Sequence, residues 1–288
     1  MNPPPYRVLL LGNLAKPYVA EAVGDAQGWL DALAEVEVCD LSAKTEGEPL
    51  AGDLGVVFGG DGAMLAAARR VADAGVPLLG VNLGRLGFMA EVPPEAAKAV
   101  LPDIIRRRPT PVERMMLAGE VLRGAESVAR VRAVNDIVVS REAHSRLIEL
   151  AVRINGEEVT TYAADGLIVS TPVGSTAHSL AAGGPILDPE MQAIVLTPIC
   201  PHTMSNRPLV VPSSKTVEIE TYSRSVGLAL TADGQIFTPL ENGDRIVVQE
   251  ADVRLRLVRA TDMTFYDTLR TKLQWGGRPY YGNGKGQG

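Results

Sequence analysis

The sequence predicts an α/β protein with an N-terminal α/β domain that holds a parallel sheet and a C-terminal, predominantly antiparallel β domain closed by a C-terminal helix. Up to about residue 109, short β-rich runs alternate with longer helical runs, which is typical of parallel strands joined by helical crossovers. From about residue 111 to 260, one β-rich segment follows another. Turn signals at Asn155-Gly156, Asp233-Gly234 and Asn242-Gly243 separate these segments and indicate antiparallel pairing.

The elements of the first part follow in order along the chain. Strands are expected at 7–11, 36–39, 54–58 and 77–81, and helices up to about residue 34, from about 62 to 73, and over PPEAAKAVLPDIIRRR. The last of these helices has prolines near its start and arginines in its final turn, both of which are common at helix ends. The segment RRPTP follows it and marks a boundary, so we predict domains at 1–109 and 110–261.

The second part is expected to contain nine β-rich segments, namely MMLAGEVLR, VARVRAVNDIVVS, RLIELAVRI, ADGLIVSTP, AIVLTPIC, KTVEIET, GLALTADGQIF, DRIVVQ and VRLRLV. After them, FYDTLRTKLQW predicts a helix within 262–275 that packs back on the first domain, because an amphipathic helix needs an apolar partner. The Gly-rich residues 276–288 are predicted to form a flexible tail.

Composition excludes several classes of protein. The 288 residues are 46% hydrophobic and 22% charged, as in a globular chain. The net charge of −6 argues against a protein whose main task is to bind nucleic acid. No apolar run approaches the ~20 residues that span a bilayer, and no signal-peptide pattern is present, so we expect a cytoplasmic protein without a membrane partner. Cys39 and Cys200 lie in apolar runs and are predicted to be reduced core residues, and no spacing of cysteines or histidines indicates a metal site.

The stretch LGVVFGGDGAMLAAARR places an acid among glycines at a predicted strand-to-helix turn. Asp61 is expected at the carboxyl end of a parallel strand, where open α/β sheets bind their ligands. Gly59, Gly60 and Gly62 would allow backbone N–H groups to close on the phosphates of a donor. A carboxylate there suits the general base of a phosphoryl transfer. The alternative is a tight turn in which Asp61 only caps the helix.

Two further stretches carry polar groups suited to a nucleotide. Asn135-Asp136 interrupts an apolar strand and offers donors and acceptors for a base or a ribose, although a β-bulge or a strand edge would explain the pair as well. In ADGLIVSTPVGSTAHSLAAGGPIL, a strand is expected to turn at Pro172-Val173-Gly174 into a short helix that begins at Ser175-Thr176. Hydroxyls and free N–H groups at that helix N-terminus would form a phosphate cradle, unless Ser175 is only a helix cap.

Together these stretches resemble the ATP-NAD kinase family. The resemblance rests on GGDG at 59–62, VNLGRLGFM at 81–89, VNDIVVS at 134–140, ADGLIVSTPVGSTAHSLAAGGPI at 164–186, PICPHTMSNRPLV at 198–210 and DGQ at 233–235. It implies transfer of a phosphoryl group from ATP, or from polyphosphate, to the 2′-hydroxyl of the adenosine ribose of NAD. It also implies a homodimer or homotetramer, and magnesium that neutralises the phosphate oxygens.

By position, the resemblance assigns a role to single residues. It makes Asp61 the catalytic base, with Gly59, Gly60 and Gly62 in the donor loop and Gly62 also near NAD. The remaining NAD-binding residues that it implies are Asn135, Asp136, Arg146, Asp165, Thr176, Ala177, His178, Ser179, Leu180, Ala181 and Gln235. His178 and Ala181 stand where most members have tyrosine and serine. Without the resemblance, Arg146 would be a solvated strand charge and Asp233-Gly234-Gln235 the turn of a β-hairpin.

Two other functions remain to be weighed. Lipid kinases carry a similar GGDG loop, but the block around GSTA argues against them. A sensor that binds NAD without catalysis would keep the same pocket, but it would not need Asp61. The dehydrogenase fingerprint GxGxxG is missing from the sequence, so NAD is expected to be the substrate.

Overall fold

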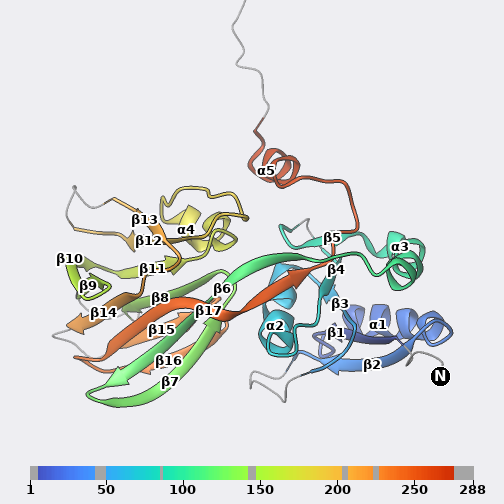
Figure 1. Ribbon diagram of the computed structural model, residues 1–288, viewed down its shortest axis with the longest axis horizontal. Coiled ribbons are helices and arrows are strands. Elements are labelled where there is room, and N and C mark those ends of the chain that lie inside the picture. The colour runs from blue at the N-terminus through green and yellow to red at the C-terminus, as the bar shows by residue number, and fades with distance from the viewer. Residues whose placement is uncertain are drawn as a thin grey trace, which may run out of the picture.

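The computed structural model describes residues 6–42, 50–84, 87–141, 147–202, 207–222 and 227–275. Its strands form one sheet of 11 strands and one of six (Figure 1). Arg146 and the predicted tail at 276–288 lie outside the described residues, as do residues 85–86 of VNLGRLGFM.

The N-terminal part has the predicted α/β arrangement. Parallel pairing gives the strand order β4-β3-β1-β2, and β5, a short strand that the sequence analysis missed, pairs with β4. The elements are β1 (Arg7–Gly12), α1 (Pro17–Leu30), β2 (Glu35–Asp40), β3 (Leu54–Gly59), α2 (Asp61–Val71), β4 (Leu78–Asn82), β5 (Ala90–Val92) and α3 (Pro94–Arg107).

Helices cover both faces of this parallel sheet. In β1, Leu9 and Leu11 belong to the apolar cluster that contains Met64 of α2. Val8 and Leu10 face the opposite way, into the cluster formed with α1 and α3. Because both faces are buried, consecutive residues of the strands are apolar, and the runs detected in the sequence are near-continuous rather than alternating.

The C-terminal part is predominantly antiparallel, as predicted. The six-stranded sheet has the order β13-β12-β11-β8-β15-β16, and all of its pairs are antiparallel. The elements are β6 (Val112–Arg123), β7 (Glu126–Ala133), β8 (Asp136–Arg141), β9 (Ile148–Ile154), β10 (Glu157–Ala164), β11 (Gly166–Ser170), the 3₁₀ turn η1 (Gly174–Thr176), α4 (His178–Ala181), β12 (Ala193–Ile199), β13 (Leu209–Pro212), β14 (Val217–Tyr222), β15 (Leu228–Ala232), β16 (Ile236–Leu240), β17 (Arg245–Leu257) and α5 (Phe265–Leu273).

The large sheet runs through both parts of the chain. β17 pairs with β6 along most of its length, and its last residue, Leu257, lies beside Leu78 of β4 in parallel register. The Val258 N–H continues this link by donating to the Leu78 carbonyl at 2.8 Å. The division at 109/110 stays a prediction, but hydrogen bonds cross it within one sheet.

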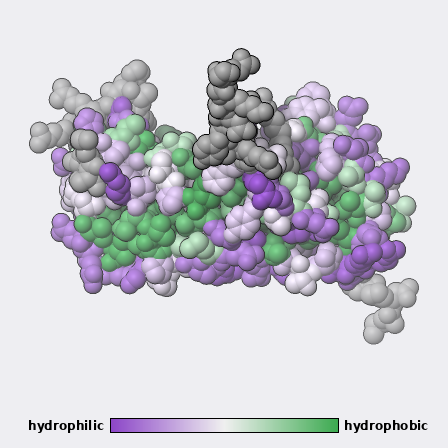
Figure 2. Space-filling view, turned by 90° about the horizontal axis from the view of Figure 1, so that it is seen from above, coloured by the Kyte–Doolittle hydropathy of each residue, from purple (hydrophilic) through white to green (hydrophobic). Residues whose placement is uncertain are grey.

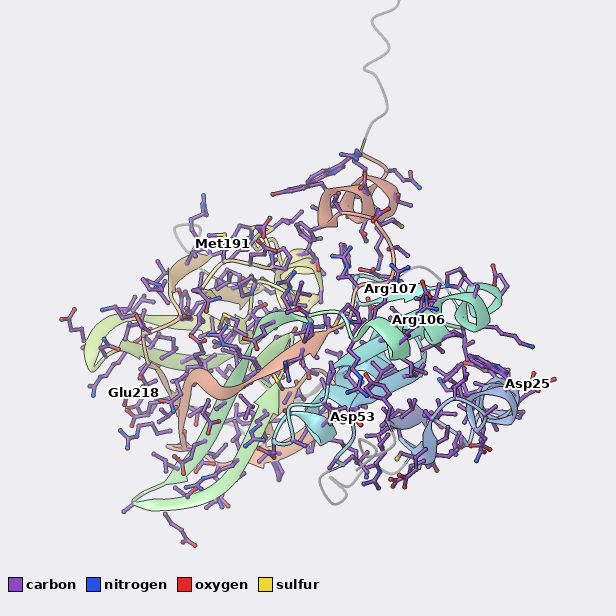
Figure 3. The ribbon with its side chains drawn as sticks, turned by 45° about the vertical axis from the view of Figure 1, so that its right-hand side comes forward. Asp25, Asp53, Arg106, Arg107, Met191 and Glu218 are labelled. Carbon is purple, nitrogen blue, oxygen red and sulfur yellow. The ribbon has the colours of Figure 1, made fainter. Side chains whose placement is uncertain are left out.

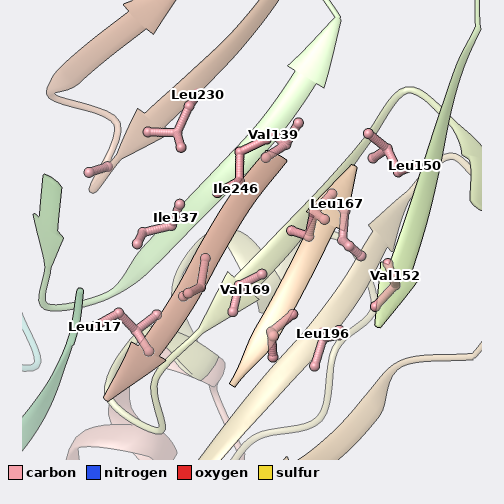
Figure 4. Packing of buried hydrophobic residues seen from close by; sticks show 14 of the residues in the cluster. Leu117, Ile137, Val139, Leu150, Val152, Leu167, Val169, Leu196, Leu230 and Ile246 are labelled. Carbon is pink, nitrogen blue, oxygen red and sulfur yellow. The ribbon is translucent and has the colours of Figure 1, made fainter. Parts of the chain in front are cut away.

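The core of the second part lies between the two sheets. Leu150 of β9 and Ile246 of β17 face Val139 of β8 and Leu167 of β11 (Figure 4), and all four side chains are fully buried. Strands that bury one face alternate in burial, as β9 does. This packing fixes the loops at the ends of β8 and β11, where the predicted binding residues lie.

The closing helix α5 contacts both parts. It is shorter than the range predicted for it, and a capping box of Thr264 and Asp267 starts it. The centroid of the Phe265 ring lies 6.1 Å from the centroid of the Phe88 ring of the first part. The Tyr266 hydroxyl donates to Asp188 of the second part at 2.8 Å. In Figures 1 and 3, α5 lies above the junction of the two parts.

The surface is mixed. Asp25 of α1 and Glu218 of β14 mark the charged exterior of the two parts (Figure 3). Seen from the side that carries α5, hydrophobic residues reach the surface of both parts, with hydrophilic residues between them (Figure 2). In the portion of the chain that the structure describes, no helix has the length and apolar character needed to cross a membrane.

The prediction that both cysteines are core residues is half wrong. Cys39 is buried in β2, whereas Cys200 is exposed directly after β12. Cys200 adopts a φ of 46°. The chain leaves the sheet there, so an apolar run in the sequence continues one residue beyond the buried strand.

Candidate active site

Asp61 is the first residue of α2, directly after the glycine turn that ends β3. Gly60 is the N-cap, so Asp61 does not cap the helix, and the alternative of a simple cap is wrong. A Cβ atom on Gly59 would lie 2.6 Å from the Ala63 Cβ, which explains why glycine is needed for so abrupt a turn. The turn places the Asp61 carboxylate at the carboxyl end of the parallel sheet, as predicted.

The segment 87–90 holds the Asp61 carboxylate. The Phe88 N–H donates to Oδ2 at 2.8 Å, and the N–H groups of Met89 and Ala90 donate to Oδ1 at 3.0 and 3.4 Å. A Cβ on Gly87 would lie only 2.0 Å from Asp61 Oδ1, so glycine permits this close approach. No role is predicted for 87–90 from the sequence, although GFM belongs to the stretch VNLGRLGFM at 81–89.

Asn135-Asp136 lies where the chain passes from one sheet to the other. β7 ends at Ala133 in the large sheet and β8 begins at Asp136 in the six-stranded sheet, so the expected single interrupted strand is instead two strands. The Asp233 carboxylate accepts the N–H groups of residues 134, 135 and 136 at 3.2, 2.7 and 3.3 Å. The Asn135 Oδ1 is buried and has no hydrogen-bond partner within the described part of the chain, so it can accept a hydrogen bond from a ligand.

Arg69 joins the helix of Asp61 to the loop of Asn135. Its guanidinium lies 2.6 Å from the Asp233 carboxylate, and the two side chains are only 6% and 0% exposed. It also donates to Gln235, whose amide donates in turn to the Gly62 carbonyl at 2.8 Å. The turn predicted at Asp233-Gly234-Gln235 is present between β15 and β16. In this structure the Gln235 side chain braces the donor loop.

Burial sets the charge state of Asp136. Together with the nearby Asp233 carboxylate, which contributes less, burial raises the pKa of this carboxyl to about 7. Burial also raises the pKa of Asp233, against the opposing effect of its N–H donors and Arg69. Asp136 therefore changes protonation near neutral pH.

Replacing Asp136 by asparagine should change the pH dependence of stability. Between about pH 4 and 7, folded Asp136 holds a proton that the unfolded chain has lost, so the free energy of unfolding falls as the pH rises through this range. An asparagine at this position does not titrate, so it avoids this loss of stability, which is on the order of 3–4 kcal/mol. In urea unfolding, the free energy of unfolding of Asp136→Asn relative to that of the wild type should therefore be higher at pH 8 than at pH 4.5. Asp25→Asn, on the exposed face of α1, is the control. An equal difference at both pH values would contradict the burial argument.

The block after β11 is built differently from the prediction. The expected single helix is two short pieces, η1 and α4, which meet at Ala177. The Ser175 hydroxyl is fully buried, donates to the Pro172 carbonyl at 2.6 Å and accepts the Leu187 N–H at 2.9 Å. The Thr176 hydroxyl donates to the Val173 carbonyl at 3.1 Å. Both hydroxyls bond within the loop, and the phosphate cradle at this helix stays a prediction.

The predicted NAD-binding residues 176–181 differ in accessibility. Ala177, His178 and Ala181 are exposed, and Thr176 and Leu180 are half-buried. Ser179 is fully buried, and its hydroxyl shares a 2.8 Å hydrogen bond with Thr197, so its side chain supports the loop from within.

Close backbone contacts bring this loop against Asn135. A Cβ on Gly174 would lie 2.1 Å from the Asn135 carbonyl oxygen, and the Thr171 N–H donates to that oxygen at 2.9 Å. Thr176 and Phe88 line the same small cavity of about 50 Å³, so the loop also faces the segment that holds Asp61. The structure thus gathers Asp61, Gly62, Asn135 and Thr176 around one region.

Asp165 lies apart from this group. It precedes β11, whereas the loop at 171–176 follows it, so five strand residues, or about 17 Å, separate them. Its carboxylate pairs with Arg141 at 2.7 Å, and the pair is partly exposed. The assignment of Asp165 to the dinucleotide stays a prediction.

A larger cavity opens beside the glycine loop. Its volume is about 680 Å³, and Gly59, Gly60 and Gly62 form part of its wall. Asn13 and Lys16, from the loop between β1 and α1, line it as well. Neither residue could be predicted from the sequence, because nothing in GNLAKP indicates that it faces the GGDG loop. The described residues contain no group of three or more His, Cys, Asp or Glu side chains that could hold a metal ion.

Comparison with known proteins agrees with these observations. The model of the ATP-NAD kinase N-terminal domain matches residues 34–108, and that of the ATP-NAD kinase C-terminal domain matches residues 134–260. The NAD kinase of Koribacter versatilis is 39% identical over 282 residues, which cover 94% of this chain and 99% of that one. The NAD kinase of Desulforamulus reducens is 42% identical over 278 residues, with coverage of 92% and 96%.

Two solved structures share the fold. A crystal structure of yeast NADH kinase complexed with NADH matches with a TM-score of 0.84 at 28% identity, covering 96% of this chain and 90% of that chain. An NAD kinase from Archaeoglobus fulgidus in complex with ATP matches with a TM-score of 0.74 at 24% identity, covering 93% and 98%. Family models that cover most of the sequence, and relatives this similar over nearly full length, show that the chain belongs to the ATP-NAD kinase family.

Proposed function

We propose that this protein transfers the γ-phosphoryl group of ATP to the 2′-hydroxyl of the adenosine ribose of NAD, giving NADP. The observation that carries the proposal is the Asp61 carboxylate, which backbone N–H groups orient at the end of the sheet beside the glycine loop. A positioned carboxylate of this kind suits the abstraction of a hydroxyl proton during phosphoryl transfer. Relatives named NAD kinase over almost the whole length support the choice of NAD as acceptor.

The donor would occupy the cavity of about 680 Å³ beside Gly59, Gly60 and Gly62. The N–H groups of Asp61 and Gly62 precede those of Ala63 and Met64, which donate to the Gly60 carbonyl, so the first two can bind phosphate oxygens, and Lys16 adds a positive charge. This volume lies within the range of about 300–1,000 Å³ that is typical of small-molecule sites, and a polyphosphate chain would use the same N–H groups and Lys16.

Mg²⁺ would enter with the donor. The described residues offer no cage of metal ligands, which agrees with the usual binding of Mg²⁺ through substrate phosphates, water and few carboxylates. When bound, it would neutralise charge on the phosphate oxygens. The chain's own part is to orient the acceptor and to take up its proton at Asp61.

The acceptor would lie across Asp61 from the donor. The free Oδ1 of Asn135 would accept a hydrogen bond from the adenosine, and the exposed residues Ala177 and His178 would border the base. Asp136, which titrates near neutral pH, would stand behind Asn135. The predicted cytoplasmic location and homo-oligomeric state stay predictions.

The test is an assay that measures NADP formation by the full chain with ATP or polyphosphate, with and without Mg²⁺. NADP should form only with a donor and a divalent metal, and NAD with a 2′-deoxy adenosine ribose should bind without being phosphorylated. Phosphate on that analogue would move the reaction to another oxygen. Binding of NAD without any NADP would indicate a sensor, and phosphorylation of a lipid instead of NAD would indicate a lipid kinase.

A further inference from the structure

The helix α5 brings a positive charge to Asp61. The Lys272 Nζ lies 4.0 Å from Asp61 Oδ2, the oxygen that also accepts the Phe88 N–H. The same ammonium stands 4.4 Å from the centroid of the Phe88 ring. Lys272 therefore contacts both the carboxylate and the residue that orients it.

The position of Lys272 is fixed by the docking of α5. The capping box of Thr264 and Asp267 holds the start of the helix, and Leu269 is buried beneath it. The ring contact of Phe265 with Phe88 and the hydrogen bond of Tyr266 to Asp188 attach α5 to both parts of the chain. Figure 3 shows the helix above their junction.

We propose that Lys272 is a positioning residue for phosphoryl transfer, which it supports by holding the Asp61 carboxylate against the charge of the incoming donor. The inference rests on the proposed role of Asp61. In that reaction the 2′-oxygen forms a bond to the γ-phosphorus, the bond from this phosphorus to the bridging oxygen of ADP breaks, and the 2′-hydroxyl proton passes to Asp61. Lys272 neither gives nor takes a proton.

Charge explains why such a residue is needed. The donor phosphates bring several negative charges to the glycine loop, and Asp61 is the first residue of the adjoining helix. Without a nearby cation, these phosphates would repel the carboxylate and turn it away from the acceptor hydroxyl. An ammonium at 4.0 Å offsets this repulsion and, because the Phe88 ring also attracts it, stays beside Asp61.

The variants Lys272→Met and Lys272→Arg separate charge from shape. Methionine keeps an unbranched chain without charge, and arginine keeps the charge. Lys272→Met should lower kcat on the order of 10–100-fold with KM for NAD nearly unchanged, and Lys272→Arg should stay within about threefold of the wild type. Arg270→Met is the matched control, because it removes a charge from the same last turn, where Arg270 pairs with Asp267 of α5 itself.

A double-mutant cycle tests whether Lys272 acts through Asp61. In the Asp61→Asn background, Lys272→Met should change the residual kcat by less than about twofold, since the group that it positions is gone. Thermal unfolding of each variant shows whether α5 remains docked.

Several outcomes would overturn the inference: a kcat of Lys272→Met within twofold of the wild type, an equal loss in Lys272→Arg or Arg270→Met, or additive losses in the cycle. An active Asp61→Asn protein would instead overturn the role of Asp61, so the two failures are distinguishable.

Discussion

Asp61→Asn should lower kcat by about 10²–10⁴-fold, which corresponds to roughly 3–5 kcal/mol of activation free energy. Asparagine keeps the size of the side chain but cannot take up the proton of the acceptor hydroxyl. Its oxygen can still accept the Met89 N–H, whereas its NH₂ group cannot accept the Phe88 N–H. The fold should therefore lose only about 1–3 kcal/mol, the cost of one unsatisfied donor.

Steady-state kinetics and calorimetric titration with NAD distinguish these effects. We expect kcat to fall while the Kd for NAD changes far less, because the Asn135 loop does not depend on the Asp61 carboxylate. Asp73→Asn, at the exposed end beyond α2, is a control for the loss of one negative charge in this region. A variant of Asp61 whose turnover stays within tenfold of the wild type would remove it as the base.

Arg69→Met should lower the free energy of unfolding by about 3–5 kcal/mol, because it leaves the buried Asp233 carboxylate without its cation. Backbone N–H groups of residues 134–136 still bind this carboxylate, which favours the lower end of the range. Arg132→Met removes an arginine from the partly exposed pair with Asp73 and should cost less than about 1 kcal/mol.

Urea unfolding at pH 7 measures both changes. If the two arginine variants lose equal stability, the buried pair is not the link between α2 and the Asn135 loop. A large loss of stability in Arg69→Met alone would agree with such a link. A raised KM for NAD in the folded Arg69→Met protein would show that the link also supports the binding site.

Local features of the site could be predicted from the sequence. The strand, glycine turn and helix around Asp61 are adjacent in the chain, so apolar periodicity and the placement of glycines define them. The break at Asn135-Asp136 was visible as polar residues in an apolar run. Its cause, a passage between sheets, was not visible, because the same residues are common at bulges and strand edges.

Contacts between distant segments could not be predicted in this way. Arg69 meets Asp233 across 164 positions, and Lys272 reaches Asp61 from the last helix. No periodicity signals such a pairing, because it depends on where the turn after β15 and the helix α5 lie relative to α2. The hydrogen-bond partners of the Ser175 hydroxyl could not be predicted for another reason. A serine at the start of a helix can bind a ligand or its own backbone, and only the fold of the loop decides between the two.

The continuous sheet has a mechanical consequence. One apolar cluster contains Leu255 and Leu257 of β17, Met116 of β6, and Leu11 and Met64 of the first part. A division of the chain near residue 109 would therefore separate residues of one apolar core. A hinge at that position would have to shear strand β17 from β4 in every cycle. The two parts of the chain are therefore expected to move as one rigid frame, and a change of position of one part relative to the other would expose this shared core to water.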